Sequence, residues 1–495
     1  MEGTRQSLLN QIIAWVANKS GWKDESHTYW IYGSPGIGKT SLAHSICEKL
    51  HDQHQLAGAF FCRKDDPTLS ELGNILPTLI YKLAEACPPF RSIVANRLRN
   101  DPNLTPESMK DSLLLDFIHE LPRHPKHALV FVIDALDECG DDQDRPVLLS
   151  VLTDAAAHVP WLKIIVTSRP EDDIQRFFKS LTQSLYSSYD LATDQEAGVD
   201  LQTFTRSQFD LVAKRWCLPT PWPEQPLFDG VISRANGLFV FIKTLALALG
   251  QCEDPEESLK ATLQGSDGPG LKPLYSLYSS ILKARRVPSN ADFRRMMGVL
   301  LTTAQYRPLC EETIAELAGV RFNIVKKWVN DLSSLLYQDD AVNGGIRVRH
   351  LSISDFFFSD HCTYQVSPQD ANVQLGIACL KTMVKQLRFN ICKLEDSRIA
   401  NADIKNLPSR IKESISDALQ YSSLYWSNHL CFAPDDGDLH IWEKLKEFFE
   451  GLYGLFWIEV LSIMGMVPIG APSLRRVISW AKVRMAPTCH LQRWF

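Results

Sequence analysis

Short apolar runs alternate with stretches of helical periodicity in the first part of the chain. Runs typical of buried strands occur at 29–32, 57–62, 128–133 and 162–166. Apolar residues with helical spacing occur at 7–16, 42–50, 69–86 and 112–121. The run 128–133 (ALVFVI) is continuously apolar, as in strands that a parallel sheet buries on both faces. The alternation predicts an α/β core with a mostly parallel sheet and flanking helices over about the first 190 residues.

Beyond Asp194 the pattern becomes helical. Helix-length stretches occur at 197–211, 227–234 and 237–249, and the sequence GSDGPG at 265–270 is typical of a loop. Short helices are expected over 287–360, together with two strand-like pieces, 335–338 and 346–349, that flank AVNGG. An Asn-Gly turn between short strands is typical of a β-hairpin. Helices with a hairpin suggest a winged-helix module, and 366–495 is expected to be helical.

The pattern divides the chain into five expected parts. These are an entry segment (1–25), the α/β domain (26–192), an all-α helical domain (193–286), a winged-helix domain (287–365) and a C-terminal helical region (366–495). The apolar stretch 451–467 is interrupted by Glu459 and is followed by Pro468. A membrane-spanning helix needs about twenty apolar residues and disfavours a central carboxylate. We therefore expect a buried helix there and no membrane span.

Composition excludes several classes of protein. Apolar residues make up 45% and charged residues 22% of the 495 residues, which excludes wholesale disorder, collagen and coiled coil. The net charge of −6 gives no basic field, so direct nucleic-acid binding is not expected. The twelve cysteines include no Cys-x-x-Cys pair, and no signal peptide is recognised. Reduced thiols and a cytoplasmic location are therefore expected.

The strongest chemical signal is Gly33-Ser-Pro-Gly-Ile-Gly38-Lys39-Thr40, which fits G-x-x-x-x-G-K-[ST] between an expected strand and an expected helix. Glycines allow such a loop to turn tightly and to aim backbone N–H groups at phosphate oxygens. Lys39 is expected to reach the β- and γ-phosphates, and the Thr40 hydroxyl to ligate Mg²⁺. The expected nucleotide-binding residues are Gly33, Ser34, Pro35, Gly36, Ile37, Gly38, Lys39, Thr40 and Ser41.

Carboxylates follow the apolar run 128–133. Asp134 ends this run, where the carboxyl edge of a parallel sheet faces a bound metal, and it is the expected second Mg²⁺ residue. Asp137 and Glu138 lie in the next turn, and one of them is expected to orient or deprotonate the attacking water. Glu138 is the first candidate and Asp137 its competitor, although acidic residues are also common where a helix begins.

A third motif, Thr167-Ser-Arg169-Pro170, follows the expected strand 162–166. An arginine at that edge can contact a γ-phosphate and so distinguish a triphosphate from a diphosphate. The motif is weak evidence alone. It gains weight because three motifs follow in order, each at the end of an expected strand.

Together GSPGIGKTS, FVIDALDEC and IIVTSRPE resemble the NACHT domain of the STAND class of signalling ATPases, in particular the NACHT proteins abundant in fungi and the related nephrocystin-like P-loop domain. Further segments resemble other parts of the family. They are the entry segment around Gly3-Thr4-Arg5, Ala235-Asn-Gly-Leu-Phe239 of the helical domain, His350-Leu-Ser-Ile-Ser-Asp355-Phe356 of the winged helix, and Tyr425-Trp-Ser-Asn-His429-Leu after it.

The resemblance implies a switch that holds ADP in a closed form and exchanges it for ATP with Mg²⁺. NACHT proteins then open and form homo- or hetero-oligomers with relatives. By the same resemblance, His350 would contact the ADP β-phosphate, and Thr4 and Arg5 would lie near the base. The alternative for His350 is a local role, in which it caps the helix expected at 352–358 or packs against it. Phe239 stands where related proteins often have a proline, so nucleotide contact from that helix is not expected. No effector domain and no full repeat array are recognised, which implies a short form or partners that supply them.

Three functions are compatible with these motifs. The first is a nucleotide-gated signalling switch, of the kind used in innate immunity or self/non-self recognition, with slow Mg²⁺-dependent ATP hydrolysis. The second is a nucleotide-binding scaffold or decoy that barely hydrolyses and pairs with full-length relatives. The third is a P-loop kinase. About 300 residues of mainly helical sequence after the core argue against a compact kinase, and the intact Lys39, Asp134 and Glu138 favour the first function over the second.

Overall fold

The structure is a computed structural model of the chain. It describes residues 5–17, 26–100, 127–159, 161–182, 184–194, 196–264, 270–340, 344–360, 362–396, 398–433 and 439–484. Thr4 and the helix expected at 112–121 lie outside the described residues, as do 265–269 and 341–343 of the two glycine-containing turns.

The chain forms two compact units. The first comprises Met1–Ser280 together with His350–Ser352, and the second comprises Ile281–Arg349 together with Ile353–Phe495. The finer division into five parts stays a prediction.

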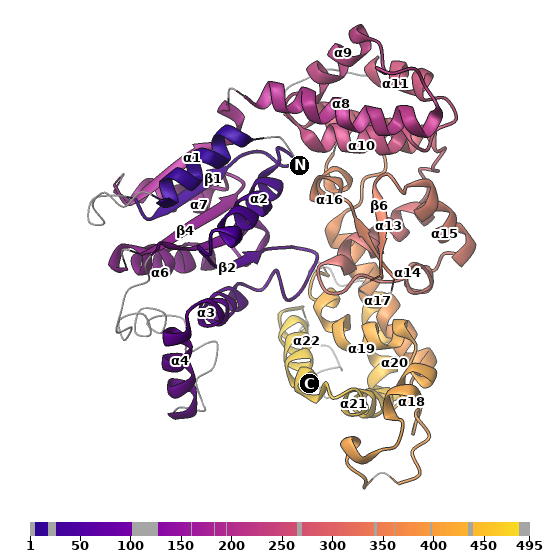
Figure 1. Ribbon diagram of the computed structural model, residues 1–495. Coiled ribbons are helices and arrows are strands. Elements are labelled where there is room, and N and C mark those ends of the chain that lie inside the picture. Colours follow the sequence, from indigo (N-terminus) through magenta and orange to yellow (C-terminus); the bar gives the residue numbers. More distant parts are fainter. Residues whose placement is uncertain are drawn as a thin grey trace. The chain divides into compact units, whose positions relative to one another are not determined.

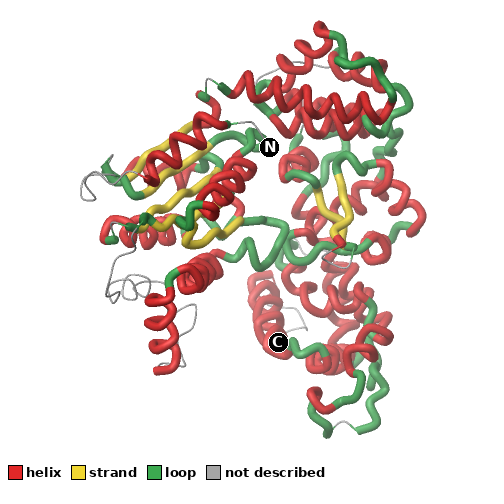
Figure 2. Tube along the Cα trace, viewed as in Figure 1, coloured by secondary structure: helices red, strands yellow, loops and turns green. Residues whose placement is uncertain are grey.

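The first unit contains a parallel sheet of five strands. They are β1 (Thr28–Tyr32), β2 (Leu56–Phe61), β3 (Leu129–Asp134), β4 (Leu162–Ser168) and β5 (Tyr186–Asp190), in the order β2-β3-β4-β1-β5. Figure 2 draws the strands in yellow. The four strands expected from their apolar runs are confirmed. The fifth was not expected, because its sequence YSSYD is polar, unlike the apolar sequence LAGAFF of β2 at the other edge of the sheet.

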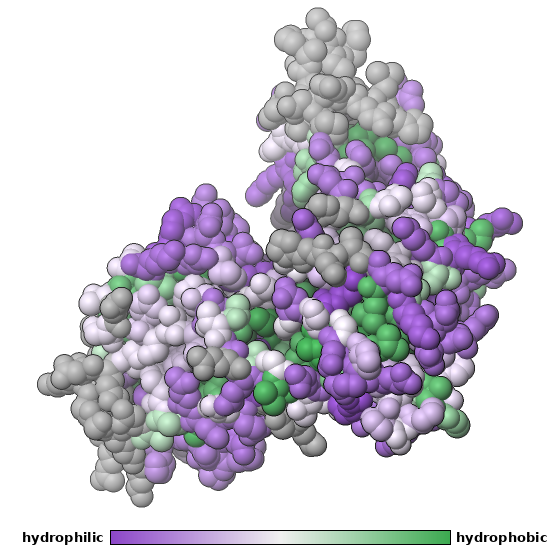
Figure 3. All heavy atoms as spheres, turned by 90° about the horizontal axis from the view of Figure 1, so that it is seen from above, coloured by the Kyte–Doolittle hydropathy of each residue, from purple (hydrophilic) through white to green (hydrophobic). Residues whose placement is uncertain are grey.

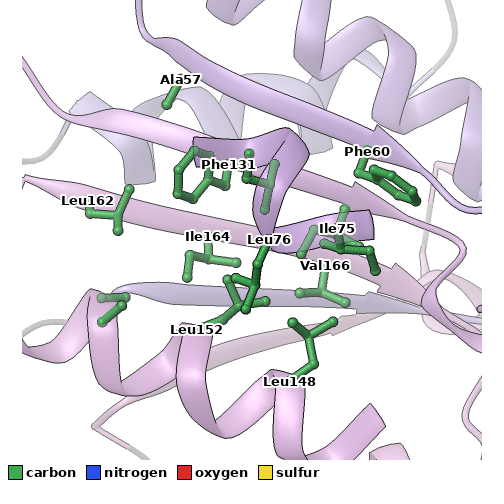
Figure 4. Packing of buried hydrophobic residues seen from close by; sticks show 14 of the residues in the cluster. Ala57, Phe60, Ile75, Leu76, Phe131, Leu148, Leu152, Leu162, Ile164 and Val166 are labelled. Carbon is green, nitrogen blue, oxygen red and sulfur yellow. The ribbon is translucent and has the colours of Figure 1, made fainter. Parts of the chain in front are cut away.

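Helices cover both faces of this sheet (Figure 1). They are α1 (Gln6–Ala17), α2 (Lys39–Asp52), α3 (Ile75–Ala86), α6 (Asp144–His158) and α7 (Asp172–Ser180), and a further helix, α4 (Pro88–Asn100), packs on α3. Val130 and Val132 of β3 pack with α1 and α2 on one face. Phe131 and Ile133 pack on the other face against α3 and α6, as the neighbourhood of Phe131 in Figure 4 shows. Burial on both faces explains the continuous apolar run, since alternate side chains of a strand point to opposite faces.

The first unit continues with helices. They are α8 (Ala197–Trp216), α9 (Gln225–Ala235), α10 (Phe239–Leu249), α11 (Pro255–Leu263) and α12 (Lys272–Ala284), whose residues up to Ser280 belong to this unit. The three helices expected between 197 and 249 are confirmed. The fold of this unit is therefore a parallel sheet with flanking helices followed by further helices, as the pattern predicted.

The second unit is mainly helical and contains one β-hairpin. Its first part holds α13 (Ala291–Ala304), α14 (Glu311–Ala318), α15 (Phe322–Asp331), β6 (Leu336–Asp339), β7 (Gly345–Val348) and most of α16 (Leu351–Phe358). The strands β6 and β7 pair antiparallel, which confirms the hairpin expected around AVNGG. That helices and hairpin form a winged-helix module stays a prediction.

The remaining helices of the second unit confirm the expectation of a helical C-terminal region. They are α17 (Pro368–Gln386), α18 (Leu407–Ser414), α19 (Asp417–Leu430), α20 (Leu439–Glu450), α21 (Tyr453–Ile463) and α22 (Gly470–Arg484). A buried hydrogen-bonded group joins α17 to α19: His429 lies 2.8 Å from both the Tyr421 hydroxyl and Asn372 Oδ1.

The expectation of a buried helix at 451–467 holds for one face only. Trp457 and Val460 of α21 are buried, whereas Leu455 is 62% exposed and Ile458 47% exposed. Glu459 has a structural role, because its carboxylate accepts the backbone N–H groups of Asn390 and Ile391. Among the described residues, no helix is both long enough and apolar enough to cross a membrane. On the face drawn in Figure 3, hydrophilic residues cover most of the described surface and hydrophobic residues form separate patches.

Candidate functional site

The loop Gly33–Gly38 connects the end of β1 to the start of α2. Gly36 (φ 79°) and Gly38 (φ 103°) have left-handed backbone conformations that only glycine adopts without strain. No side chain caps the start of α2 at Gly38, so a bound anion can accept the N–H groups of the first helical turn. The loop therefore has the local geometry that its motif predicts for a phosphate site.

Lys39 is the first residue of α2, and its side chain reaches back to this loop. Its ammonium donates to the carbonyl oxygens of Gly33 at 2.7 Å and Ser34 at 3.1 Å, and its side chain is buried. Burial lowers the pKa of Lys39, whereas the carboxylates of Asp137, Asp134 and Glu138 act to raise it. The carbonyl contacts hold the positive charge at the loop, where it can neutralise phosphate.

Asp134 ends β3 beside the loop. The Thr167 hydroxyl at the end of β4 donates to Asp134 Oδ1 at 2.5 Å and accepts the backbone N–H of Ala135 at 2.9 Å. Burial raises the pKa of Asp134, and hydrogen bonds from Thr167 and Thr40 act in the opposite direction. Thr40 and Asp134, far apart in sequence, thus share one place at the carboxyl edge of the sheet.

This pair of oxygen groups fits Mg²⁺. Within the described part of the chain, no group of three or more His, Cys, Asp or Glu residues could hold a metal by itself. Mg²⁺ is commonly held by one or two protein oxygens together with substrate phosphates and water. A hydroxyl and a carboxylate beside a phosphate loop match that requirement.

Asp137 contacts Arg169 at two points. The backbone N–H of Arg169 donates to Asp137 Oδ1 at 2.8 Å, and the guanidinium Nε lies 3.2 Å from Oδ2. Asp137 is only 5% exposed, whereas Arg169 is 22% exposed. Asp137 therefore positions the third motif, and its carboxylate is already engaged there.

Glu138 has a different environment. One of its carboxylate oxygens lies 3.4 Å from the backbone N–H of Lys64, which follows β2. Burial, and next the neighbouring Asp137, raise the pKa of Glu138 to about 8. A carboxylate with a pKa near neutrality is a stronger base than an ordinary glutamate, as proton abstraction requires. The two candidates for the base thus differ in what they contact.

Arg5 links the entry segment to the loop. Its guanidinium forms an ion pair with Asp194, donates to the carbonyl oxygen of Ile37 at 3.3 Å and lies 5.8 Å from the centre of the Phe239 ring. Its backbone N–H donates to Asp200 at 2.8 Å. These contacts hold Arg5 against the loop itself. Thr4, the other expected residue of this segment, lies outside the described residues.

His350 also lies at the loop. Its Cε1 atom is 3.8 Å from the place where a Cβ on Gly36 would be, and its Nδ1 accepts the backbone N–H of Ser352 at 3.1 Å. Burial and the positive charges of Arg169, Lys39 and Lys243 lower the pKa of His350 to about 4. The ring is therefore neutral near pH 7. Three cations close to one histidine mark a place suited to an anion.

Two contacts at the site were missed from the sequence. The first turn of α10 touches the loop, because the Val240 N–H donates to the Gly36 carbonyl at 3.2 Å. The presence of Phe239 in place of a proline predicted no contact from this helix with the nucleotide, but a backbone contact with the loop does not depend on that side chain.

Arg145 of α6 is the second. It is buried, and its Nε lies 2.8 Å from Asp173 at the start of α7. Its Nη1 lies 3.3 Å from the Gly140 carbonyl and 3.5 Å from that of Cys139. Arg145 thus ties the segment after Glu138 to the segment after Arg169. No sequence motif indicated Arg145, because it contacts one carboxylate, that of Asp173, and two backbone carbonyl groups.

Residues 3–169 match the model of the family described as Nephrocystin 3, N-terminal. A search of curated proteins finds no match. Among solved structures, the chain is similar to a Signal Transduction ATPase with Numerous Domains (STAND) protein with a tetratricopeptide repeat sensor from Pyrococcus horikoshii, at 14% identity and a TM-score of 0.40, covering 97% of this chain and 64% of that one. The chain thus spans less than two thirds of that protein.

Two further solved structures are similar to parts of the chain. One is a Walker-type ATPase of Pyrococcus abyssi, at 14% identity and a TM-score of 0.33, covering 71% of this chain and 95% of that one. The other is the ORC2 protein of Aeropyrum pernix in ADPNP-ADP complexes, at 13% identity and a TM-score of 0.32, covering 77% and 95%. The family match over 3–169, the parallel sheet and the loop geometry make the first part of the chain P-loop NTPase-like.

Proposed function

We propose that the chain is an ATP/ADP-binding NTPase whose bound nucleotide acts as a switch, as in NACHT-type signalling proteins. The observation that carries this proposal is that Thr40 and Asp134 lie close together beside a glycine loop whose carbonyl groups hold the Lys39 ammonium. Polyphosphate with Mg²⁺ is the ligand whose charge and oxygen groups suit that set. The family match over residues 3–169 supports the same assignment.

Each residue has a role in this proposal. The amides of residues 33–41 and the Lys39 ammonium bind the phosphates, and Thr40 and Asp134 hold Mg²⁺, which would neutralise phosphate charge when bound. Glu138 accepts a proton from the attacking water, since its carboxylate is less engaged than that of Asp137. Arg169 contacts the γ-phosphate. Arg5 stabilises the loop from the entry segment.

The switch depends on a difference in affinity between nucleotide states. A ligand shifts a conformational equilibrium only by binding one state better than another. His350 can donate a hydrogen bond to phosphate from its neutral ring, and Arg169 can detect the γ-phosphate. We propose that ADP stabilises a closed form and that ATP permits homo- or hetero-oligomers with NACHT-type relatives in the cytoplasm. The winged-helix assignment around His350 belongs to this proposal.

The test uses the full chain. We expect chromatography of the denatured, purified protein to show copurifying ADP or ATP, and calorimetry of the emptied protein to show binding of both in the presence of Mg²⁺. Lys39→Ala should abolish binding, and Lys49→Ala, an exposed residue on the same helix, should not. A chain that neither retains nor binds adenine nucleotides would refute the proposal. Size-exclusion chromatography with a non-hydrolysable ATP analogue tests whether ATP permits oligomers to form, and a larger particle than with ADP is expected.

A second candidate function, a weakly hydrolysing scaffold, is favoured by one observation. With a pKa of about 8, Glu138 is largely protonated at pH 7 and is then not a base. Single-turnover hydrolysis separates the two functions. A rate no faster than that of Glu138→Gln would favour the scaffold, and a rate at least about tenfold faster would favour the switch that hydrolyses ATP.

A further inference from the structure

The side chains of Tyr278, Ser352 and His350 form a row of hydrogen bonds in the first unit, and this row leads to the loop Gly33–Gly38. The Tyr278 hydroxyl lies 2.8 Å from Ser352 Oγ, and this oxygen lies 2.7 Å from His350 Nδ1. Tyr278 and Ser352 are fully buried. The Cε1 atom of the same ring lies 3.8 Å from the place of a Cβ on Gly36. This row of hydrogen bonds therefore ends at the loop for which we propose phosphate binding.

The direction of each hydrogen bond follows from the Ser352 backbone N–H, because this group can donate but cannot accept. The backbone N–H of Ser352 lies 3.1 Å from His350 Nδ1, and an amide nitrogen only donates, so Nδ1 accepts and carries no proton. Ser352 Oγ must donate to Nδ1 as well, because two lone pairs at 2.7 Å would repel. Since a serine hydroxyl has one proton, the Tyr278 hydroxyl donates to Ser352.

The consequence is a defined tautomer. A neutral imidazole whose Nδ1 accepts carries its proton on Nε2. Within the described residues this Nε2 makes no hydrogen bond. His350 therefore presents one N–H donor in an environment that also contains Lys39, Arg169 and Lys243. That donor matches a phosphate oxygen.

We propose that Tyr278 and Ser352 are positioning residues that set the tautomer and orientation of His350, so that its Nε2–H donates to a phosphate oxygen of the bound nucleotide. The inference rests on the proposed function and adds to it two residues that regulate nucleotide release without touching the nucleotide. Loss of one neutral hydrogen bond between Tyr278, Ser352 and His350 should raise the ADP dissociation rate about two- to tenfold.

The first experiment reads the tautomer without nucleotide. Long-range proton–nitrogen NMR spectra of the full chain with labelled histidine give the state of each ring, and His350→Ala identifies the signals of His350. We expect the wild type to show the Nε2–H form. Ser352→Ala removes the shorter hydroxyl contact and keeps the backbone N–H at 3.1 Å, so it should populate the Nδ1–H form only in part. Tyr278→Phe should shift the same signals less, because Ser352 can still donate. Wild-type signals of the Nδ1–H form would overturn the inference.

The second experiment measures ADP dissociation by stopped flow with a fluorescent ADP analogue. Ser352→Ala and Tyr278→Phe should speed dissociation, and Tyr275→Phe, on the same helix, is the control. In a His350→Ala background neither change should have an effect, because both residues act through the ring. Unchanged rates in the wild-type background, or equal effects in both backgrounds, would overturn the inference. Absence of any ADP binding by the wild type would instead refute the proposed function, and the NMR result would still stand.

Discussion

Arg169 and Asp137 contact each other through both backbone and side chain, with N–H to Oδ1 at 2.8 Å and Nε to Oδ2 at 3.2 Å. This relationship separates two acidic neighbours that the sequence could only rank, with Glu138 before Asp137. Asp137 holds the arginine in place, and Glu138 remains the better candidate for the base. The proposed γ-phosphate contact therefore depends on a carboxylate that need not touch the nucleotide.

Asp137→Asn tests that dependence. The amide keeps the size of the side chain but removes the charge that orients the guanidinium, so the preference for ATP over ADP should fall up to about tenfold, equivalent to about 1.4 kcal/mol. Competitive binding of both nucleotides measures this ratio. Asp142→Asn, an exposed change on the following segment, is the control. An unchanged ratio would mean that Arg169 does not read the γ-phosphate.

Glu138→Gln should leave ATP binding intact and slow hydrolysis by about 10² to 10⁴-fold, the usual contribution of a general base. In the wild type, kcat/KM should rise with pH towards about 8, because the base acts only when deprotonated. The variant should lose this ascending limb. Persistence of the limb in Glu138→Gln would assign the base to another group.

The same raised pKa predicts a stability effect with a defined sign. The folded state favours protonated Glu138. Its contribution to the free energy of unfolding is therefore fully present below the ordinary glutamate pKa of about 4.5 and is lost as pH rises through about 8. The melting temperature of Glu138→Gln without nucleotide should therefore exceed that of the wild type at pH 8 and approach it near pH 4. Glu71→Gln, exposed on the segment after β2, should show no such trend.

Gly36→Ala and Gly237→Ala form a matched pair, because both glycines have φ near 79°. A Cβ on Gly36 would lie 2.1 Å from Val240 Cγ1, whereas a Cβ on Gly237 would meet nothing within 4 Å. Both variants should lose about 1–2 kcal/mol of folding stability from backbone strain. Gly36→Ala alone should also weaken ATP binding by at least about tenfold in calorimetry. Equal binding by the two variants would show that the α10 contact does not shape the loop.

Arg145→Met should slow hydrolysis more than it weakens nucleotide binding, because it frees the segments that follow Glu138 and Arg169 without touching the loop 33–38. Arg145→Lys should restore part of the rate, since one charge contact with Asp173 survives. Steady-state kcat and KM, compared with calorimetric Kd, separate these effects. Arg176→Met, exposed on α7, is the control. Equal losses in binding and rate would indicate general destabilisation.

The sequence alone determined the main elements of the first unit and predicted the type of its site. Continuous apolar runs identified four of the five strands. Three of them, β1, β3 and β4, lie inside the sheet, where burial on both faces requires apolar residues throughout, and β2 is an apolar edge strand. The polar strand β5 gave no such signal. Glycine spacing identified the loop, since Gly36 and Gly38 adopt conformations that other residues avoid. Asp134 could be placed beside Thr40 because parallel strands end at one edge of the sheet.

Only the tertiary structure decided what each polar group contacts. Three contacts of the site show this: Asp137 with Arg169, the Val240 N–H with the Gly36 carbonyl, and Arg145 with the Gly140 carbonyl. Each of them joins residues that are distant in sequence or uses a backbone atom. Sequence motifs record side-chain types at fixed spacing, and hydrogen bonds to backbone groups leave no such pattern. The tautomer of His350 is of this kind, because it is set by the Ser352 amide, the Ser352 hydroxyl and a tyrosine 74 residues from that serine.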